Sequence, residues 1–193
     1  MRYFPKCDYR EEGRFVSLVS GAGHRVAVRR KLVDATHTET QVPATHPPSF
    51  GIDAGVHCVP PNALPQLAAA HPHYVVLGGG KTGLDACLWL LEHEVPADAI
   101  TWVVPRDPWL VDRTHLQPGD DFFEQRVGSI ALQMELISRA SSIPHLLRLL
   151  EASGQLLRLD PAVEPTMYRC ATVTRAELDR LREIEHVVRL GRV

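Results

Sequence analysis

Hydrophobic and polar positions change their pattern along the chain, and each pattern predicts a different kind of element. Near the N-terminus, apolar and polar residues alternate over 14–20 and 24–33. These two runs flank a turn that begins at Gly21, and alternation on either side of a glycine-bearing turn is typical of a β-hairpin. The first part of the chain is therefore predicted to contain an antiparallel pair of strands.

A proline-rich segment follows the predicted hairpin. Residues 36–65 contain six prolines, and proline lacks a backbone donor and interrupts helices. We expect an irregular connector here, with at most short strands, such as one over 56–59. The change in composition predicts two domains: residues 1–68, a hairpin with its linker, and residues 69–193.

The middle of the chain predicts a strand–helix–strand unit. The continuous apolar run 74–77 suits a strand buried on both faces, and a second run, 100–104, stops at a proline. Between them, residues 84–94 predict an amphipathic helix, because apolar residues recur at i, i+3, i+4 and i+7: Leu84, Cys87, Leu88 and Leu91. Such a unit pairs its two strands in parallel.

The last third of the chain predicts helices. Helical periodicity covers 122–139 and 143–152. A capping box that begins at Thr174 predicts a further helix to Glu185, and an apolar run from Val187 to the end predicts a strand. The predicted fold class is α/β, with a Rossmann-like parallel sheet, an N-terminal β-hairpin and a helical C-terminal third.

Composition and charge narrow the classes of function. The 193 residues carry 21 basic and 23 acidic side chains, a net charge of −2, and this balance excludes the basic surface that nucleic-acid binding requires. No apolar run reaches the roughly 18 residues of a membrane span, and the N-terminus lacks the apolar core of a secretory signal. We therefore expect a cytoplasmic protein with no membrane partner.

The cysteines predict no metal site. They form no C-x-x-C pair, and their wide spacing favours reduced thiols over a disulfide framework: Cys7, Cys58, Cys87 and Cys170. Apolar neighbours predict that Cys58 and Cys87 are small core residues.

The glycine-rich run after 74–77 carries the main functional prediction. Gly78, Gly80 and Gly83 form G-x-G-x-x-G: the first permits a tight turn, the second lets the backbone approach a pyrophosphate, and the third lets the helix pack close to the strand. A P-loop is excluded, because the position of its first glycine is Val75. The motif therefore predicts a dinucleotide site at Gly78, Gly79, Gly80, Lys81, Thr82 and Gly83. The alternative is a glycine turn that binds no ligand.

The end of the second strand predicts which dinucleotide binds. An Arg there suits the 2′-phosphate of NADP, and an acidic residue suits the free ribose hydroxyl of NAD. Arg106 comes first and Asp107 follows, so NADP is favoured and NAD stays open; Arg113 is a second candidate for the phosphate. No catalytic residue is assigned. One of the histidines in or beside the connector is a candidate proton donor, although surface positions are favoured for them: His46, His57, His71 and His73.

Residues 74–107 resemble the NAD(P)H-binding half of flavoproteins with two dinucleotide-binding domains, such as flavin-containing monooxygenases and disulfide-reductase-like oxidoreductases. The strand that ends at 33–36 is similar to the one that closes the flavin domain of that family, and the connector resembles the crossover between its domains. The resemblance implies FAD as a second cofactor and hydride transfer from NADPH to FAD. His37 stands where the family usually has glycine, and this chain has one G-x-G-x-x-G where the family has two.

These departures predict that the chain is the middle part of a longer protein whose flavin site lies on another domain or partner. An apolar surface left by the flavin domain would favour a homodimer. Two other functions stay open. One is a non-catalytic nucleotide-binding or interaction module that contacts a partner through 122–185, and the other is a flavin-free NAD(P)-dependent dehydrogenase. The small-molecule substrate is not identified by the sequence.

Overall fold

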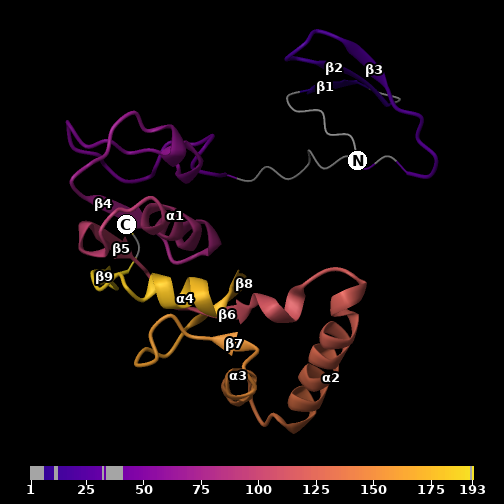
Figure 1. Ribbon diagram of the computed structural model, residues 1–193, viewed down its shortest axis with the longest axis vertical. Coiled ribbons are helices and arrows are strands. Elements are labelled where there is room, and N and C mark those ends of the chain that lie inside the picture. Colours follow the sequence, from indigo (N-terminus) through magenta and orange to yellow (C-terminus); the bar gives the residue numbers. More distant parts are fainter. Residues whose placement is uncertain (1–6, 11–12, 32, 34–40, 192) are drawn as a thin grey trace. The chain divides into compact units, whose positions relative to one another are not determined.

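The fold is mixed α/β, with several helices and small sheets (Figure 1). The computed structural model describes residues 7–10, 13–31, 33, 41–191 and 193. The chain divides into two compact units, Met1–Val42 and Pro43–Val193, called here the N-terminal and C-terminal units. The domain limits predicted from the sequence, 1–68 and 69–193, stay a prediction.

The N-terminal unit contains an antiparallel sheet of three short strands. These are β1 (Cys7–Arg10), β2 (Arg14–Ser17) and β3 (Gly23–Arg25), in the order β1-β2-β3. Phe15 is buried and stacks on His24 of the neighbouring strand, with ring centroids 5.1 Å apart. The predicted hairpin is confirmed as β2 and β3, and β1 was not predicted.

The second strand of the hairpin is shorter than expected. It ends at Arg25 rather than at residue 33, and the chain is irregular over 26–31. Residues 34–36, which carry the likeness to the closing strand of a flavin domain, lie outside the described residues. The predicted strand at 56–59 is wrong, because those residues are irregular and lead into the 3₁₀ helix η2 (Pro61–Gln66).

The C-terminal unit contains the predicted strand–helix–strand unit. Strands β4 (Tyr74–Leu77) and β5 (Ile100–Val103) pair in parallel, and α1 (Lys81–Glu92) connects them. On its other side β5 pairs in parallel with β9 (Val187–Val188), so the order of this sheet is β4-β5-β9. The final apolar run therefore forms a strand, although a shorter one than 187–193.

The apolar run of β4 predicted a strand buried on both faces, but one face of β4 is exposed. Tyr74 and Val76 are half-buried, whereas Val75 and Leu77 on the opposite face are 59% and 42% exposed. An apolar run alone cannot distinguish a central strand from one at the edge of a sheet, since only the tertiary arrangement decides what covers each face.

Helix α1 is the predicted amphipathic helix, and it begins three residues earlier than expected. It ends in a Schellman motif, in which the Glu94 amide donates to the Leu91 carbonyl (3.3 Å) and the Val95 amide to the Leu90 carbonyl (3.1 Å). Glu94 takes the left-handed conformation that this motif requires, with φ 61°. The short 3₁₀ helix η3 (Ala97–Ala99) then leads into β5.

A second sheet, which the sequence did not predict, combines a strand directly after β5 with two strands from the last third of the chain. Strands β7 (Leu156–Leu157), β6 (Pro108–Asp112) and β8 (Met167–Val173) lie side by side in that order. Strand β6 is antiparallel to β7 and parallel to β8. The prediction of a helical C-terminal third is therefore confirmed for its helices, but it missed strands β7 and β8.

The helices of this region lie close to their predicted positions. They are α2 (Phe123–Arg139), α3 (Ile143–Ala152) and α4 (Arg175–Leu181), with the 3₁₀ helices η4 (Arg113–Leu116) and η5 (Asp120–Phe122) before α2. The capping box at Thr174 is confirmed, but α4 ends four residues before Glu185. In the described ranges, the helices are all too short or too polar to cross a bilayer.

The core of the C-terminal unit joins both of its sheets to α1 and α4. The fully buried residues include Trp102 of β5 and Leu110 of β6. Cys87 lies in this core, as predicted, and burial raises the pKa of its thiol to about 12. Cys58 is exposed, so its prediction as a core residue is wrong. This packing fixes the start of α1 beside the carboxyl end of β5.

Candidate functional site

The glycine-rich loop lies between β4 and α1, and two hydrogen bonds from β5 hold it in place. The Gly78 amide donates to the Val103 carbonyl (2.8 Å), and the Gly78 carbonyl accepts from Nε1 of the Trp102 indole (2.9 Å). Gly78 has φ 116°, a conformation that side chains rarely adopt. The tight turn predicted at Gly78 is therefore present, and its position depends on β5.

Two further glycines are required by the packing of the chain itself. A Cβ at Gly83 would collide with the carbonyl oxygen of Gly78, because α1 packs directly against the turn. A Cβ at Gly79 would lie 2.8 Å from a methyl group of Val104, at the end of β5. Gly83 thus admits only glycine, and a side chain at Gly79 would require Val104 to move, for reasons that involve no ligand.

Gly80 differs from its neighbours. Apart from its two chain neighbours, none of the described residues would have a heavy atom within 4 Å of a Cβ placed there, and its backbone angles (φ −87°, ψ 177°) are open to any residue. It occupies the N-cap position of α1, where Ser, Asp or Asn would be better than glycine by only a few tenths of a kcal/mol. Among the described residues, no side chain caps this N-terminus. Glycine is an acceptable N-cap, but no packing contact requires it at this position.

Lys81 and Thr82 occupy the first turn of α1. The Lys81 ammonium pairs with the Asp85 carboxylate one turn later, and both side chains are partly exposed. Thr82 is exposed. Lys81 would approach a phosphate with its charge already partly balanced, so the uncapped backbone amides at the start of α1 are the stronger anion donors here.

Arg106 lies next to the glycine-rich loop. Its carbonyl oxygen would be 3.5 Å from a Cβ at Gly79, and its side chain is exposed, with no ion-pair partner in the part of the chain that the structure describes. The structure therefore places Arg106, the residue predicted to bind the 2′-phosphate, next to the glycine-rich loop.

The Asp107 carboxylate, next in sequence to Arg106, is already occupied by a partner within the chain. It is buried, and the Arg189 guanidinium binds both of its carboxylate oxygens, with N–O distances of 2.9 and 3.2 Å. The hydrogen bond to Asp107 raises the pKa of Arg189, although burial opposes it. Asp107 is a structural partner of the C-terminal segment rather than a group free to bind a ribose. The sequence held no signal for a partner 82 residues away.

Arg113, the second candidate for the phosphate, is not at the glycine-rich loop. It follows β6, where its guanidinium pairs with Glu177 of α4 (3.0 Å) and donates to the Thr172 carbonyl (3.4 Å). Burial would raise the pKa of Glu177, but hydrogen bonds from Thr174 and the charge of Arg113 outweigh burial and lower it. Arg113 therefore stabilises the second sheet and α4.

The histidines next to β4 lie at the other end of the parallel strands. His73 shares a hydrogen bond with the Thr101 hydroxyl (2.9 Å), and the His71 amide donates to the Tyr74 hydroxyl (3.0 Å). Tyr74 begins β4, whereas the glycine-rich loop follows its carboxyl end. These histidines are therefore not placed to transfer a proton at the loop.

Comparison with known proteins finds relatives whose own function is not established. The chain is 48% identical over 191 residues to uncharacterized proteins of Mycobacterium bovis and of two Mycobacterium tuberculosis strains, CDC 1551 / Oshkosh and H37Rv. The match covers 99% of this chain and 35% of each relative, so the chain spans about a third of their length. No known protein-family signature matches the chain. No solved structure matches it either.

Proposed function

We propose that residues 74–107 bind NADPH, with its pyrophosphate on the backbone amides at the start of α1. The observation that carries the proposal is Gly80. A glycine that no contact in the described chain requires, at an uncapped helix N-terminus, leaves room for an anion to approach the backbone. A ligand-free glycine turn would explain Gly78, Gly79 and Gly83, but it would not explain Gly80.

The order of the parallel sheet supports the same proposal. The chain runs from β4 through α1 to β5 and later adds β9 beside β5. This is the arrangement of one mononucleotide-binding half of a Rossmann-like fold, with the glycine motif after its first strand. Ligands of such sheets bind outside the carboxyl ends of the strands, which is where the glycine-rich loop and Arg106 lie.

The choice of NADPH over NADH rests on Arg106 and Asp107. Arg106 is exposed beside the loop, whereas the carboxylate that would recognise an unmodified ribose is bound by Arg189. A guanidinium binds phosphate with two parallel charge-assisted hydrogen bonds, so Arg106 suits the 2′-phosphate.

In a complete protein we propose that NADPH supplies a hydride to a flavin, as in the oxidoreductases that residues 74–107 resemble. This chain would contribute binding and orientation of the nicotinamide nucleotide, since the cofactor carries the chemistry. The flavin rests on the sequence resemblance alone. A visible absorption spectrum of the purified chain tests it, because oxidised flavin absorbs near 450 nm and NADPH would bleach that band.

The test of dinucleotide binding is a fluorescence titration of the full chain with NADPH, before and after the substitution Gly80→Asp. Asp is a good N-cap, so the variant should unfold at the same temperature or a higher one. Its carboxylate would occupy the place of the pyrophosphate, so we expect affinity for NADPH to fall at least 100-fold. Unchanged affinity in a folded Gly80→Asp protein would disprove the pyrophosphate site.

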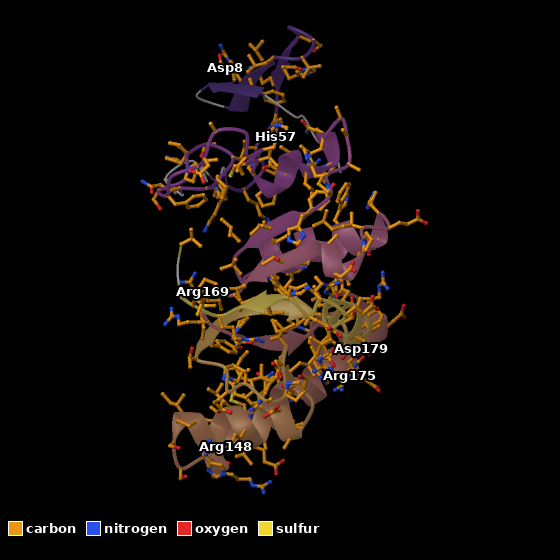
Figure 2. All side chains as sticks on the ribbon, turned by 90° about the vertical axis from the view of Figure 1, so that its left-hand side faces the viewer. Asp8, His57, Arg148, Arg169, Arg175 and Asp179 are labelled. Carbon is orange, nitrogen blue, oxygen red and sulfur yellow. The ribbon has the colours of Figure 1, made fainter. Side chains whose placement is uncertain are left out.

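A second titration tests the role of Arg106. The substitution Arg106→Ala should weaken NADPH binding about 10-fold or more and leave NADH binding nearly unchanged, because a charge-assisted hydrogen bond contributes about 1.5–3 kcal/mol. Arg148→Ala is the matched control, since Arg148 is exposed on α3 (Figure 2). Equal losses for both nucleotides would remove the 2′-phosphate from the proposal.

The alternative function, an interaction module, is favoured by one observation. Helix α2, inside the segment 122–185, exposes several large apolar side chains. This surface and the glycine-rich loop involve different residues, so the two functions do not exclude each other.

A further inference from the structure

Helix α2 carries a regular exposed apolar stripe. Five apolar residues recur at intervals of four and three along the helix, which is the 3.5-residue repeat of helices that pair with other helices. Each is about half exposed or more: Phe123 65%, Val127 47%, Ile130 47%, Met134 62% and Ile137 51%. These five residues are called here the α2 stripe.

The other face of α2 is the one that packs inward. Ser129 and Leu136 are buried, and the buried side chain of Gln155 accepts hydrogen bonds from Ser129 (3.2 Å) and Gln133 (2.5 Å). At 3.6 residues per turn, the centre of this inner face and the centre of the α2 stripe are roughly 130° apart. The bonds to Gln155 set the rotation of the helix, which leaves the α2 stripe exposed. Helix α2 lies at the edge of the C-terminal unit (Figure 1).

The exposed area of the stripe is large enough to form an interface. Its side chains expose on the order of 500 Å² of apolar surface, the size of the largest functional patch on a typical monomer. Two copies of the stripe would bury about 1,000 Å² together, which is the lower limit for a specific interface. A second copy of this chain therefore suffices to cover the stripe.

We propose that two copies of the chain pair through α2, antiparallel and centred on Ile130. In this arrangement Ile130 packs against its own counterpart, Val127 packs against Met134, and Phe123 packs against Ile137. A small side chain meets a long one in each outer layer, so the layers have similar volumes. A parallel pair would place Val127 on Val127 and Phe123 on Phe123, which fills the interface unevenly.

The polar residues that flank the stripe also suit an antiparallel pair of identical helices. Arg126 of one copy would face Gln133 of the other, and Glu124 would face Ser138, so no two like charges meet. Opposed helix dipoles add a small favourable contribution. The pairing is isologous, as in most homodimers, and it does not depend on dinucleotide binding.

Sedimentation of the full chain tests the pairing. We expect the apparent mass to rise from 21.5 kDa toward twice that value as protein concentration increases. Ile130→Glu should hold the chain as a monomer at every concentration, with an unchanged circular dichroism spectrum because Ile130 is partly exposed. Leu190→Glu, at a highly exposed apolar residue outside the stripe, should leave the dimer intact.

Cysteine cross-linking tests the antiparallel geometry, in a background with Cys7, Cys58 and Cys170 changed to serine. Ile130→Cys should form a disulfide-linked dimer on mild oxidation. Phe123→Cys and Ile137→Cys should not cross-link by themselves, because each would lie about 20 Å from its own counterpart. A mixture of these two variants should cross-link.

Three results would overturn the proposal. A chain that stays monomeric at all concentrations would leave the stripe to a different macromolecule. A dimer that survives Ile130→Glu would use another surface. Cross-linking of Phe123→Cys with itself would indicate a parallel pair.

Discussion

At the scale of single residues, the glycines of the G-x-G-x-x-G motif have different roles. Gly83 is required because the backbone of the turn at Gly78 occupies the space of its Cβ, whereas a Cβ at Gly80 would meet nothing. The spacing of the motif is the same in both cases. Only the distances from an added Cβ to its neighbours distinguish a glycine that the fold requires from one that leaves room for a ligand.

This difference predicts that two alanine substitutions lower stability by different amounts. Gly83→Ala should lower the free energy of unfolding by about 1–3 kcal/mol or more, because the added methyl group forces α1 away from the turn. Gly80→Ala should lower it by no more than about 0.5–1 kcal/mol, because alanine is a poorer N-cap than glycine but its methyl group meets no other described residue. Urea unfolding of both variants measures the effect, and equal stability would mean that α1 does not pack tightly on the turn.

At the scale of elements, short segments depend on partners distant in sequence. Helix α4 has seven residues, too few to be stable by itself in water. Its capping box supplies local hydrogen bonds, and Arg113 binds the same Glu177 carboxylate from the segment after β6. The element is thus specified locally but held in position by contacts with the second sheet and the segment after it, which include the bond from Arg175 to Asp112 of β6.

This arrangement predicts a pH-dependent contribution from Glu177. Its pKa is lowered in the folded protein, so the carboxylate stabilises the fold above the unfolded pKa of about 4.3, and this stability is lost as pH falls through the lower folded value. Glu177→Gln should therefore cost about 1 kcal/mol at pH 7 and progressively less below pH 4.

Thermal unfolding across this pH range measures the effect of Glu177→Gln. Glu183→Gln is the control, because Glu183 forms an exposed pair with Arg180 that contributes little to stability. A cost for Glu177→Gln that does not change with pH would show that the charge of Glu177 is not what stabilises α4.

At the scale of the whole molecule, the described chain contains two compact units with separate packing. The members of the main core cluster, and the residues packed against it, all come from 64–187. In the described part of the N-terminal unit, the buried hydrophobic side chain is that of Phe15, which stacks on His24 within its small sheet. The stability of the C-terminal unit should therefore not depend on residues 1–42.

A truncated protein tests this independence. Residues 43–193 should unfold cooperatively within a few degrees of the full chain and should retain its affinity for NADPH, since both the core and the proposed site lie in this unit. Differential scanning calorimetry and the same fluorescence titration measure both properties. Loss of cooperative unfolding would show that the N-terminal unit completes the core.

The amino-acid sequence by itself determined the elements whose signals are local. The strand–helix–strand unit follows from two apolar runs around a helical repeat, and the capping box at Thr174 follows from the short-range hydrogen bonds of its residues. Helices α2 and α3 likewise have continuous periodicity. In each case the deciding interactions join residues a few positions apart, so a short stretch of sequence contains the information.

Only the tertiary structure decided the features that join distant residues. Strands β6, β7 and β8 form one sheet, in which β6 pairs with strands that begin 44 or more residues after it ends. No local pattern predicted these three strands. The sequence left Asp107 as a candidate to bind the ribose of NAD, but the structure shows that Arg189 binds its carboxylate. The periodicity of α2 likewise predicted a helix, but not which of its two apolar faces is buried. Long-range contacts depend on the path of the whole chain, so a local sequence pattern does not predict them.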